Sequence, residues 1–200
     1  MSVGRAIDIV VSGFGLIALS PLMLGVALAI AAANGHPIIF RQQRATLGGR
    51  TFCLVKFRTM NDRRMADGTP LPDALRITTI GGWLRSRRLD ELPQLWNVLV
   101  GDMSLIGPRP LLPETIVQAG DRGVQRGRAR PGMTGWAQVN GNTLLADADK
   151  IALDLWYLEH RSIALDWHIL LRTLEVMWAG ERTSPVAIRR AYESHSRRRG

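Results

Sequence analysis

The fold is decided by the stretch Arg85-Ser86-Arg87-Arg88-Leu89-Asp90-Glu91-Leu92-Pro93-Gln94-Leu95-Trp96-Asn97, in which two adjacent carboxylates stand between a run of arginines and an apolar segment. The apolar residues recur at spacings of three and four, which predicts an amphipathic helix facing a core: Leu89, Leu92, Trp96 and Leu99. Pro93 is tolerated only in the first turn of a helix, where its missing N–H would have no partner. The helix is therefore expected to begin at about Leu89 or Asp90.

The adjacent carboxylates Asp90 and Glu91 lie at this predicted helix N-terminus. Free N–H groups and the positive end of the helix dipole stabilise anions there, including a phosphate bound beside them. Taken alone, the pair also fits a structural role, with Asp90 as the helix cap and Glu91 in the first turn, because such caps are common. The pair alone does not distinguish a phosphate-binding role from a structural one, so the other motifs of the chain are needed.

The composition indicates one domain with an anionic partner. The chain has 200 residues, enough to bury its own core. Its formal net charge of +9 comes almost wholly from arginine, with Lys56 and Lys150 as the only lysines. This excess favours nucleic acid, a phosphorylated substrate or a membrane surface as the partner, although it can also reflect genomic composition. The single cysteine, Cys53, excludes an intrachain disulfide, fits a reducing compartment and is expected in the core.

The N-terminal segment predicts a membrane anchor. From Ala6 to Ala33 the only charged residue is Asp8, and nearly all the others are aliphatic or small. The run exceeds the roughly 20 residues of a spanning helix and is too long for the apolar core of a signal peptide. Ser20-Pro21 lies near its middle, where proline kinks or breaks a helix and the serine hydroxyl is able to satisfy a freed backbone group.

Basic residues flank this segment on both sides. Arg5 precedes it, and Arg41, Arg44 and Arg50 follow it. Because basic flanks tend to stay cytoplasmic, both ends are expected on the same side of the membrane. A kinked span does not satisfy this condition, whereas a hairpin of two helices that enters one leaflet and returns does. We therefore predict a re-entrant anchor over residues 1–35, with the rest of the chain on the cytoplasmic side.

Residues 37–60 predict two strands joined by a turn. Residues 37–40 and 51–58 are rich in β-forming side chains, and they flank the polar turn at 46–50. Lys56 and Arg58 alternate with apolar residues, which places both cations on one face of the second strand, toward either solvent or an anion. Residues 61–75 carry glycine and proline at turn positions and predict a surface loop without chemistry.

Two later segments are expected to bind an anion. In Gly107-Pro108-Arg109-Pro110 the prolines fix the backbone around Arg109, so less entropy is lost when its planar fork meets a phosphate. The second segment, Arg130-Pro131-Gly132-Met133-Thr134-Gly135-Trp136, follows two further arginines, and its glycines let the backbone approach a ligand closely.

The last third is predicted to be helical. Apolar residues recur at helical spacing from Ala148 to Trp178, with an interruption near Ser162. Most of its tryptophans are expected to pack in the core, and the others to lie at a membrane interface. Residues 181–200 are expected to form a flexible basic tail that can touch anionic lipid. The predicted fold is α+β and mostly α, with a re-entrant membrane helix, interfacial amphipathic helices, a small β-hairpin in a domain over 36–180, and the tail.

Four motifs together resemble the bacterial sugar transferase family, the monotopic polyprenyl-phosphate phosphoglycosyl transferases that start the assembly of surface polysaccharides and glycoproteins. The motifs are Lys56-Phe57-Arg58-Thr59-Met60, Leu89-Asp90-Glu91-Leu92-Pro93-Gln94-Leu95-Trp96-Asn97, Gly101-Asp102-Met103-Ser104-Leu105-Ile106-Gly107-Pro108-Arg109-Pro110 and Arg130-Pro131-Gly132-Met133-Thr134-Gly135-Trp136-Ala137-Gln138-Val139. They stand in the family's order, and the resemblance runs from Arg5 to about Trp178. The length resembles the minimal form, a catalytic domain with its anchor.

The resemblance implies a two-step exchange. The carboxylate at the Asp90 position attacks the β-phosphorus of a UDP-sugar and UMP leaves; polyprenyl phosphate then takes the phosphosugar, giving a polyprenyl diphosphate sugar. Glu91 matches the magnesium-binding partner of the nucleophile, so Asp90 and Glu91 are expected to share Mg²⁺. Arg85 matches an active-site arginine, and Arg109 matches the arginine implicated in nucleotide-diphosphate binding. Ser20-Pro21 matches the break in the family's re-entrant helix.

Residues and resemblance together give a set of expected substrate-binding residues: Lys56, Arg58, Arg85, Pro108, Arg109, Pro110, Arg130 and Thr134. The expected setting is the cytoplasmic face of the bacterial inner membrane, where a monotopic enzyme reaches both a cytosolic UDP-sugar and a lipid-phosphate head group. The apolar hairpin allows a homodimer, and nucleic acid is not an expected partner. Two alternatives stay open: a membrane-anchored adaptor that holds nucleic acid or anionic lipid and needs no acidic pair, and a hydrolase that passes the phosphosugar to water.

Two positions depart from the family pattern, and the transferred sugar is not identified by any motif. The family commonly has glycine where this chain has Thr46, so the turn there is expected to adopt a different backbone shape. Arg88 stands two residues before the aspartate, where small polar residues are usual. It either strengthens diphosphate binding, slows product release or points to solvent.

Overall fold

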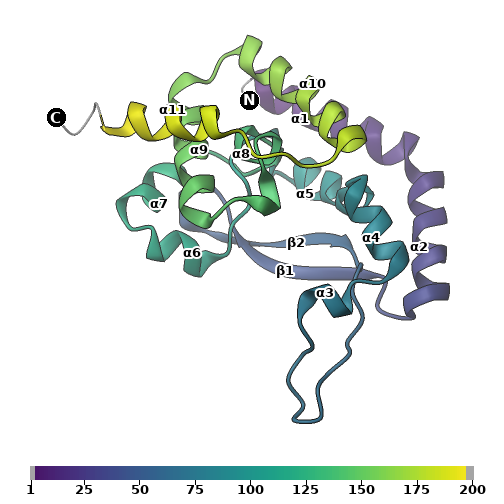
Figure 1. Cartoon of the computed structure of the whole chain (residues 1–200). Helices are drawn as coiled ribbons and strands as arrows, with labels where there is room; N and C mark the ends of the chain where they lie inside the picture. Colours follow the sequence, from purple (N-terminus) through teal and green to yellow (C-terminus); the bar gives the residue numbers. More distant parts are fainter. Residues whose placement is uncertain (1–2, 197–200) are drawn as a thin grey trace.

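The computed structural model describes residues 3–196 and shows a mostly helical chain (Figure 1). It also contains two small two-stranded sheets. The predicted α+β, mostly α fold is thereby confirmed. Ser2 and the arginines at 197–199 of the predicted tail lie outside the described residues.

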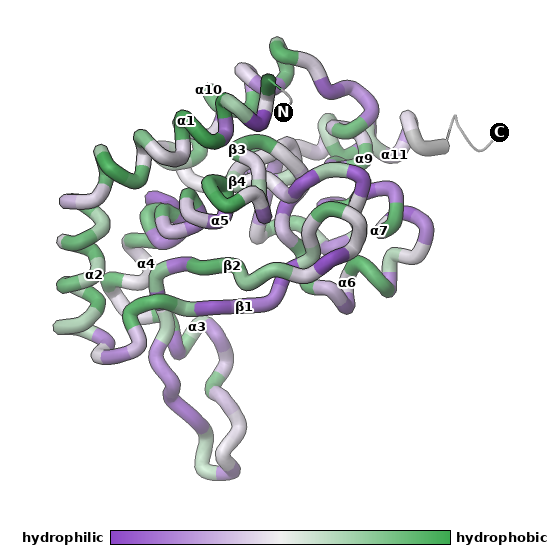
Figure 2. Tube along the Cα trace, turned by 180° about the vertical axis from the view of Figure 1, so that it is seen from behind, coloured by the Kyte–Doolittle hydropathy of each residue, from purple (hydrophilic) through white to green (hydrophobic). Residues whose placement is uncertain are grey.

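The apolar N-terminal segment forms a bent pair of helices. α1 (Val3–Ala18) and α2 (Ser20–Asn34) meet at an angle of 59°. The break lies where the sequence predicted it: the Ser20 hydroxyl donates to the carbonyl of Ile17 at 2.7 Å, and Pro21 occupies the first turn of α2. Within residues 3–196 no single helix is long and apolar enough to cross a bilayer, whereas the bent pair qualifies by length and composition. Figure 2 shows both helices as largely hydrophobic.

Polar side chains join α1 to the globular part. The guanidinium of Arg5 donates to the carbonyls of Val98 at 2.6 Å and Leu99 at 2.7 Å. Asp8 is buried and accepts a hydrogen bond from the hydroxyl of Ser104 at 2.8 Å. The start of α1 therefore lies against the globular part, and the end of α2 leads directly into it.

The predicted hairpin is present. β1 (Ile39–Ala45) pairs antiparallel with β2 (Thr51–Phe57), with Phe40 opposite Lys56, and the connection contains the 3₁₀ turn η1 (Leu47–Gly49). The hairpin crosses the middle of the molecule, and the chain that leaves it runs out as a long protruding loop (Figure 1). This loop was predicted to extend to residue 75, but it ends earlier, because its last turn is the short helix α3 (Asp73–Arg76).

Cys53 was expected in the core, which is wrong: it is exposed, because Phe52 and Leu54 on the opposite face of β2 are the buried residues. Thr46 has an extended backbone, with φ at −121°, and its hydroxyl donates to the carbonyl of Asp102 at 2.6 Å. The backbone at Thr46 therefore does not require glycine.

The acidic pair precedes its helix and does not begin it. α4 (Thr79–Ser86) is followed by a single 3₁₀ turn, η2 (Leu89–Glu91), and then by α5 (Gln94–Val100). The predicted start at Leu89 or Asp90 was thus too early for the α-helix. Trp96 was expected in the core and is 55% exposed. The 3₁₀ turn shifts the buried face of α5 by one residue, so that Leu95 and Val98 face inward.

A second, parallel sheet was not predicted. β3 (Ser104–Ile106) pairs with β4 (Gly132–Thr134), and the chain between them forms α6 (Pro113–Gln118) and α7 (Asp121–Arg126). A Cβ atom on Gly132 would lie 2.0 Å from the backbone nitrogen of Gly107. This glycine therefore lets two backbones pack together, in place of the predicted close approach of backbone to ligand.

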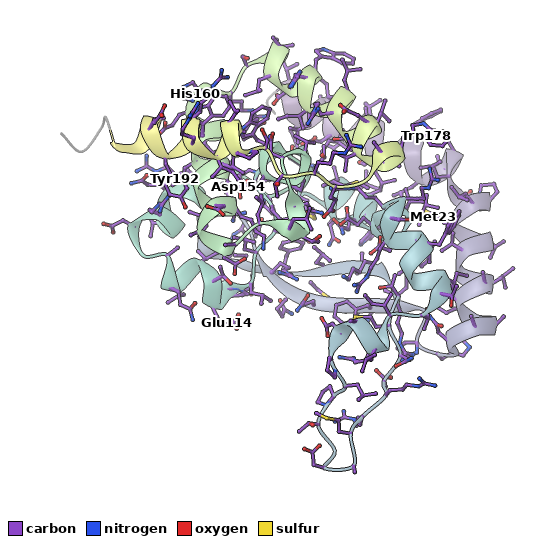
Figure 3. The ribbon with its side chains drawn as sticks, viewed as in Figure 1. Met23, Glu114, Asp154, His160, Trp178 and Tyr192 are labelled. Carbon is purple, nitrogen blue, oxygen red and sulfur yellow. The ribbon has the colours of Figure 1, made fainter. Side chains whose placement is uncertain are left out.

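The last third contains the two predicted helices, α9 (Asp147–His160) and α10 (Ile163–Ala179). Ser162 ends the gap between them as the N-cap of α10, with its hydroxyl accepting from the N–H of Leu165 at 3.2 Å. One side of α10 leaves large apolar side chains 59% to 81% exposed: Ile163, Trp167, Leu171, Leu174 and Trp178. In Figure 3, Trp178 lies at the edge of the molecule, at the end of α10.

The chain between and after these helices completes the core. α8 (Trp136–Val139) and the 3₁₀ turn η3 (Asn142–Leu144) precede α9, and α11 (Pro185–Ser196) packs against it. Ala187 and Ala191 of α11 are buried in one hydrophobic cluster with α9. Up to Ser196, the expectation of a flexible tail from residue 181 is therefore wrong.

Candidate active site

A side-chain amide places the acidic pair beside β2. Asn97 of α5 is 2% exposed; its oxygen accepts from the N–H of Val55 at 3.1 Å and its nitrogen donates to the carbonyl of Cys53 at 2.9 Å. The side-chain amide thus pairs with the β2 backbone as a neighbouring strand would, through one acceptor and one donor. Because the turn that precedes α5 packs against β2, Lys56 and Asp90 act on each other electrostatically.

Arg85 enters the site from α4. Its Nε donates to the hydroxyl of Thr59 at 2.8 Å. The helix lies very close to this residue: a Cβ atom on Gly81 would be 2.0 Å from the carbonyl oxygen of Thr59. Thr78 caps the helix, since its side chain accepts from the N–H of Gly81 at 3.1 Å. Cap and glycine hold the start of α4 against Thr59, and the hydrogen bond from Arg85 in the last turn of α4 returns to the same residue.

The electrostatics of Asp90 suit a group that changes its charge near neutral pH. Its side chain is 5% exposed, and burial raises its pKa to about 6, with a further upward contribution from the neighbouring Glu91. Lys56 and Arg85 act in the opposite direction and lower the pKa of Asp90. Burial in turn lowers the pKa of Lys56, and Asp90 opposes this shift. At pH 7 Asp90 is mostly ionised, and both Lys56 and Arg85 favour this charged form.

Arg88 is buried, which excludes one of the three alternatives for it, that it points to solvent. Its backbone is left-handed, with φ at 54°, and its side chain is 9% exposed. The guanidinium donates to the carbonyl of Gln138 at 3.0 Å, lies 3.9 Å from a carboxylate oxygen of Glu91 and 3.4 Å from one of Glu181. The left-handed residue reverses the chain between α4 and η2, which turns its side chain inward.

The loop around Arg109 is held by a buried ion pair. Asp154 and Arg126 are 0% and 4% exposed and lie 2.7 Å apart. Asp154 also accepts from the N–H of Arg109 at 3.3 Å, and Arg126 donates to the carbonyl of Arg109. Asp154 lies in the interior in Figure 3. The flanking prolines were expected to fix this loop. In addition, both backbone polar groups of Arg109 are hydrogen-bonded to the buried ion pair, and the guanidinium of Arg109 donates to the side-chain oxygen of Asn142.

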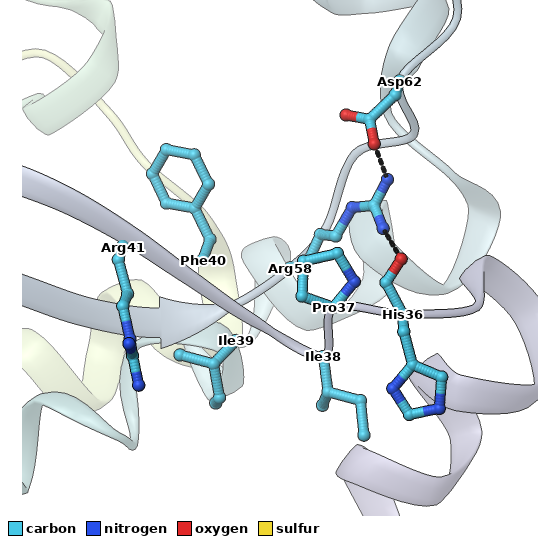
Figure 4. Close-up of a pocket in the computed structure, with 8 residues that line it drawn as sticks. All are labelled: His36, Pro37, Ile38, Ile39, Phe40, Arg41, Arg58 and Asp62. Carbon is cyan, nitrogen blue, oxygen red and sulfur yellow. Dashed lines mark hydrogen bonds and ion pairs between the residues drawn. The ribbon is translucent and has the colours of Figure 1, made fainter.

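Arg58 does not join the acidic pair. Its guanidinium donates to the carbonyl of His36 at 2.8 Å and to Asp62 at 2.5 Å, and its Nε donates to the carbonyl of Met60 at 2.9 Å. Arg58 lies in an open hollow of about 640 Å³ at the start of β1. Figure 4 shows the residues that line it, which also include Pro37, Ile38, Ile39, Phe40 and Arg41. A role for Arg58 in substrate binding stays a prediction.

Arg130 and Thr134 are also engaged within the fold. Arg130 donates to the carbonyl of Gly101 at 2.9 Å, and the hydroxyls of Thr134 and Thr173 lie 2.7 Å apart. Pro108 is fully buried, and its carbonyl accepts from the N–H of Gly132 at 2.8 Å. The hydrogen bond from Gly132 joins the segment 130–136 to the Pro-Arg-Pro loop.

Several residues that shape the site were not predicted for that purpose: Asp8, Asn97, Asn142, Asp154 and Glu181. Three of them carried a signal, because Asp8, Asn97 and Asp154 are polar residues at positions where the surrounding pattern is apolar. Such a residue costs free energy unless it is hydrogen-bonded, which makes it a candidate for a buried contact. Nothing in the sequence singles out Asn142 or Glu181.

The acidic pair fits Mg²⁺. Within residues 3–196 no three side chains of His, Cys, Asp or Glu gather into a metal-binding cluster. Mg²⁺ does not need such a cluster, since it is usually held by one or two carboxylates together with substrate phosphates. Asp90 and Glu91 supply two carboxylates beside a group of cations suited to phosphate.

The chain is similar to known sugar transferases over most of its length. The model of the bacterial sugar transferase family matches residues 1–180. The chain is 40% identical over 181 residues to the uncharacterized sugar transferase EpsL of Bacillus subtilis, a match that covers 90% of each chain. It is 42% identical to the undecaprenyl-phosphate glucose phosphotransferase of Komagataeibacter xylinus and 39% identical to the UDP-N-acetylgalactosamine-undecaprenyl-phosphate N-acetylgalactosaminephosphotransferase of Aeromonas hydrophila. The chain spans only 35% and 44% of the length of these two relatives.

Proposed function

Since the chain belongs to the bacterial sugar transferase family, we propose that it transfers a phosphosugar from a UDP-sugar to undecaprenyl phosphate through a covalent intermediate on Asp90, with release of UMP. One relative, 42% identical, is named an undecaprenyl-phosphate glucose phosphotransferase, and two others, 39% and 37% identical, are named UDP-glucose:undecaprenyl-phosphate glucose-1-phosphate transferases. The observation that carries the proposal is the buried carboxylate of Asp90, which lies beside Glu91 and under the influence of Lys56 and Arg85.

The charges around Asp90 fit this chemistry. An anionic nucleophile and an anionic diphosphate repel each other unless cations lie close by, and Lys56, Arg85 and Arg88 supply them. In the first step a carboxylate oxygen of Asp90 forms a bond to the β-phosphorus, and the bond from this phosphorus to the bridging oxygen breaks, so that UMP leaves with the electron pair. In the second step an oxygen of undecaprenyl phosphate attacks the same phosphorus and frees the carboxylate of Asp90.

Glu91, together with Asp90, would hold Mg²⁺. When bound, the ion neutralises charge on the diphosphate and on the departing UMP. The guanidinium of Arg88 lies 3.9 Å from a carboxylate oxygen of Glu91 and restrains this side chain.

The proposed setting is the cytoplasmic face of the inner membrane, with the bent α1 and α2 as a re-entrant anchor. Three observations support it: the break at Ser20-Pro21, the contact of Arg5 with the globular part, and the exposed apolar side of α10. A site held at this surface reaches a lipid phosphate and a cytosolic nucleotide without moving either across the membrane.

The test is UMP release from a panel of UDP-sugars by the full chain in nanodiscs, with Mg²⁺ and undecaprenyl phosphate. We expect release with at least one sugar by the wild type and by Asp147→Asn, a control at an exposed carboxylate, and none by Asp90→Asn. Without the acceptor, sugar label should remain on wild-type protein. Release by Asp90→Asn at the wild-type rate would contradict the covalent role, and free sugar phosphate as the final product would favour the hydrolase.

A further inference from the structure

We infer that Glu181 is a positioning residue of this site, which ties two arginines, Arg88 and Arg109, to one carboxylate. The inference rests on the proposed function, because it concerns binding of the donor diphosphate. Glu181 lies in the loop between α10 and α11, far in sequence from both arginines.

Both carboxylate oxygens of Glu181 are occupied. Oε1 accepts from the side-chain nitrogen of Asn142 and lies 3.4 Å from Nη2 of Arg88. Oε2 accepts from the N–H of Thr143 at 3.1 Å and from its hydroxyl. The side chain is 24% exposed, so these contacts are made at the edge of the interior. Four donors converge on one carboxylate.

Asn142 extends this contact to Arg109. Its oxygen accepts from the guanidinium of Arg109 while its nitrogen donates to Glu181, so one amide bridges the two charges. The residue is 3% exposed and has a left-handed backbone, with φ at 45°, which is uncommon outside glycine but tolerated by asparagine. Together with Arg88 and Glu91, a continuous chain of contacts links the acidic pair to the Pro-Arg-Pro loop.

The loop that carries Glu181 is itself held in place. Gly180 ends α10 with φ at 83° and its N–H donates to the carbonyl of Val176 at 2.9 Å. The N–H of Ser184 donates to the carbonyl of Asn140 at 3.2 Å. Figure 1 shows this loop returning across the molecule from the end of α10 to the start of α11. Glu181 is therefore presented to the site from a tethered segment.

The physical role follows from the charges. Two guanidinium groups that bind one diphosphate repel each other before it arrives, and long side chains lose entropy when they are fixed. Glu181 holds Arg88 directly and Arg109 through Asn142, so both are already oriented when the donor binds. Glutamine cannot replace it. Both oxygens accept hydrogen bonds, so the amide nitrogen of glutamine would face donors at either position. The hydrogen bonds at that position would then be lost.

The test compares Glu181→Gln with Glu175→Gln, a matched control on α10 whose carboxylate pairs at the surface with Arg172. Steady-state UMP release and binding of UDP in the presence of Mg²⁺ are measured on the full chain in nanodiscs. We expect the KM for the UDP-sugar and the Kd for UDP to rise about tenfold in Glu181→Gln, with kcat changed less than about threefold. The control should match the wild type.

A second set of variants keeps the inference testable. Glu181→Asp keeps the charge but shortens the side chain, so it is expected to raise the same constants if Glu181→Gln does not fold. In Arg88→Ala with Glu181→Gln, the combined loss of affinity should be smaller than the product of the two single losses. Unchanged KM and Kd in Glu181→Gln or Glu181→Asp, even with a lower melting temperature, would overturn the inference. A wild type that binds UDP but releases no UMP would contradict the proposed function alone.

Discussion

The carboxylate of Asp8 accepts a hydrogen bond from the hydroxyl of Ser104 at 2.8 Å and a second from the N–H of Leu105 at 3.0 Å. The one charge in the apolar N-terminal run is thus the residue that binds α1 to the start of β3. A carboxylate in such surroundings is retained because its oxygens are satisfied by protein donors.

Replacing Asp8 should weaken the contact between α1 and β3 and so lower the stability of the protein. We expect Asp8→Ala to lower the free energy of unfolding by about 2 to 4 kcal/mol, because two donors lose their acceptor. Asp8→Asn should cost less, since its amide oxygen still accepts. Thermal unfolding in detergent measures both. Asp147→Ala, which removes an exposed carboxylate in the first turn of α9 and its surface pair with Lys150, serves as the control and should stay within about 1 kcal/mol of the wild type. An Asp8→Ala variant as stable as this control would contradict the assignment.

The rate of the first half-reaction should depend on pH through Asp90. The pKa of this carboxyl is raised to about 6, so the nucleophile is protonated below that pH. Labelling of the protein by a UDP-sugar without acceptor is expected to fall about tenfold per pH unit below pH 6 and to level off above about pH 7. In Lys56→Met the midpoint should move to higher pH, because Lys56 lowers this pKa. A flat profile between pH 5 and 7 would count against Asp90.

The same carboxyl should make stability depend on pH. Because the folded pKa is raised from 3.8 to about 6, the folded chain binds a proton more tightly than the unfolded chain, and stability is lost as pH rises through this window. Asp90→Asn removes this loss. It is expected to be more stable than the wild type at pH 8, by roughly 3 kcal/mol at most, and to show a much smaller difference at pH 4. Denaturation at both pH values checks the sign, and equal differences at the two would contradict it.

Two adjacent glycines of α4 offer a matched comparison. A Cβ on Gly81 would meet the backbone of Thr59 at 2.0 Å, whereas one on Gly82 would have only a methyl group of Ile77 at 3.7 Å. Gly81→Ala is expected to lower the free energy of unfolding by about 2 to 4 kcal/mol, and Gly82→Ala to raise it by up to about 1 kcal/mol through helix propensity. Gly81→Ala should also slow UMP release, since Thr59 holds Arg85. Similar stabilities would show that α4 has room to move.

The sequence predicted those parts of the fold that depend on local patterns. The break at Ser20-Pro21, the hairpin and the two long C-terminal helices follow from proline chemistry, alternation and periodicity. The buried face of α5 was predicted one residue too late, at Trp96 in place of Leu95. The reason is that a 3₁₀ turn precedes the helix, and the two have different numbers of residues per turn. No local pattern distinguishes them here.

The site was predictable only where its residues are neighbours in the chain. Asp90 and Glu91 stand together, and their burial beside Lys56 depends on contacts that a sequence does not display. The clamp on Arg109 needs Asp154, 45 positions away, and the tie to Arg88 needs Glu181, 93 positions away. These pairings exist because helices from the end of the chain pack over its middle, which is a property of the tertiary structure.

The contact of Arg5 with the carbonyls of Val98 and Leu99 has a practical consequence for handling the protein. The anchor supplies the cap for the last turn of α5, the helix that follows the acidic pair. A truncated, water-soluble fragment that begins after Asn34 would leave those carbonyls without this partner and uncover the side of α5 that α1 protects. Such a fragment is a poor substitute for the intact chain in crystallisation or inhibitor screening, because the membrane segment and the reaction centre share one scaffold.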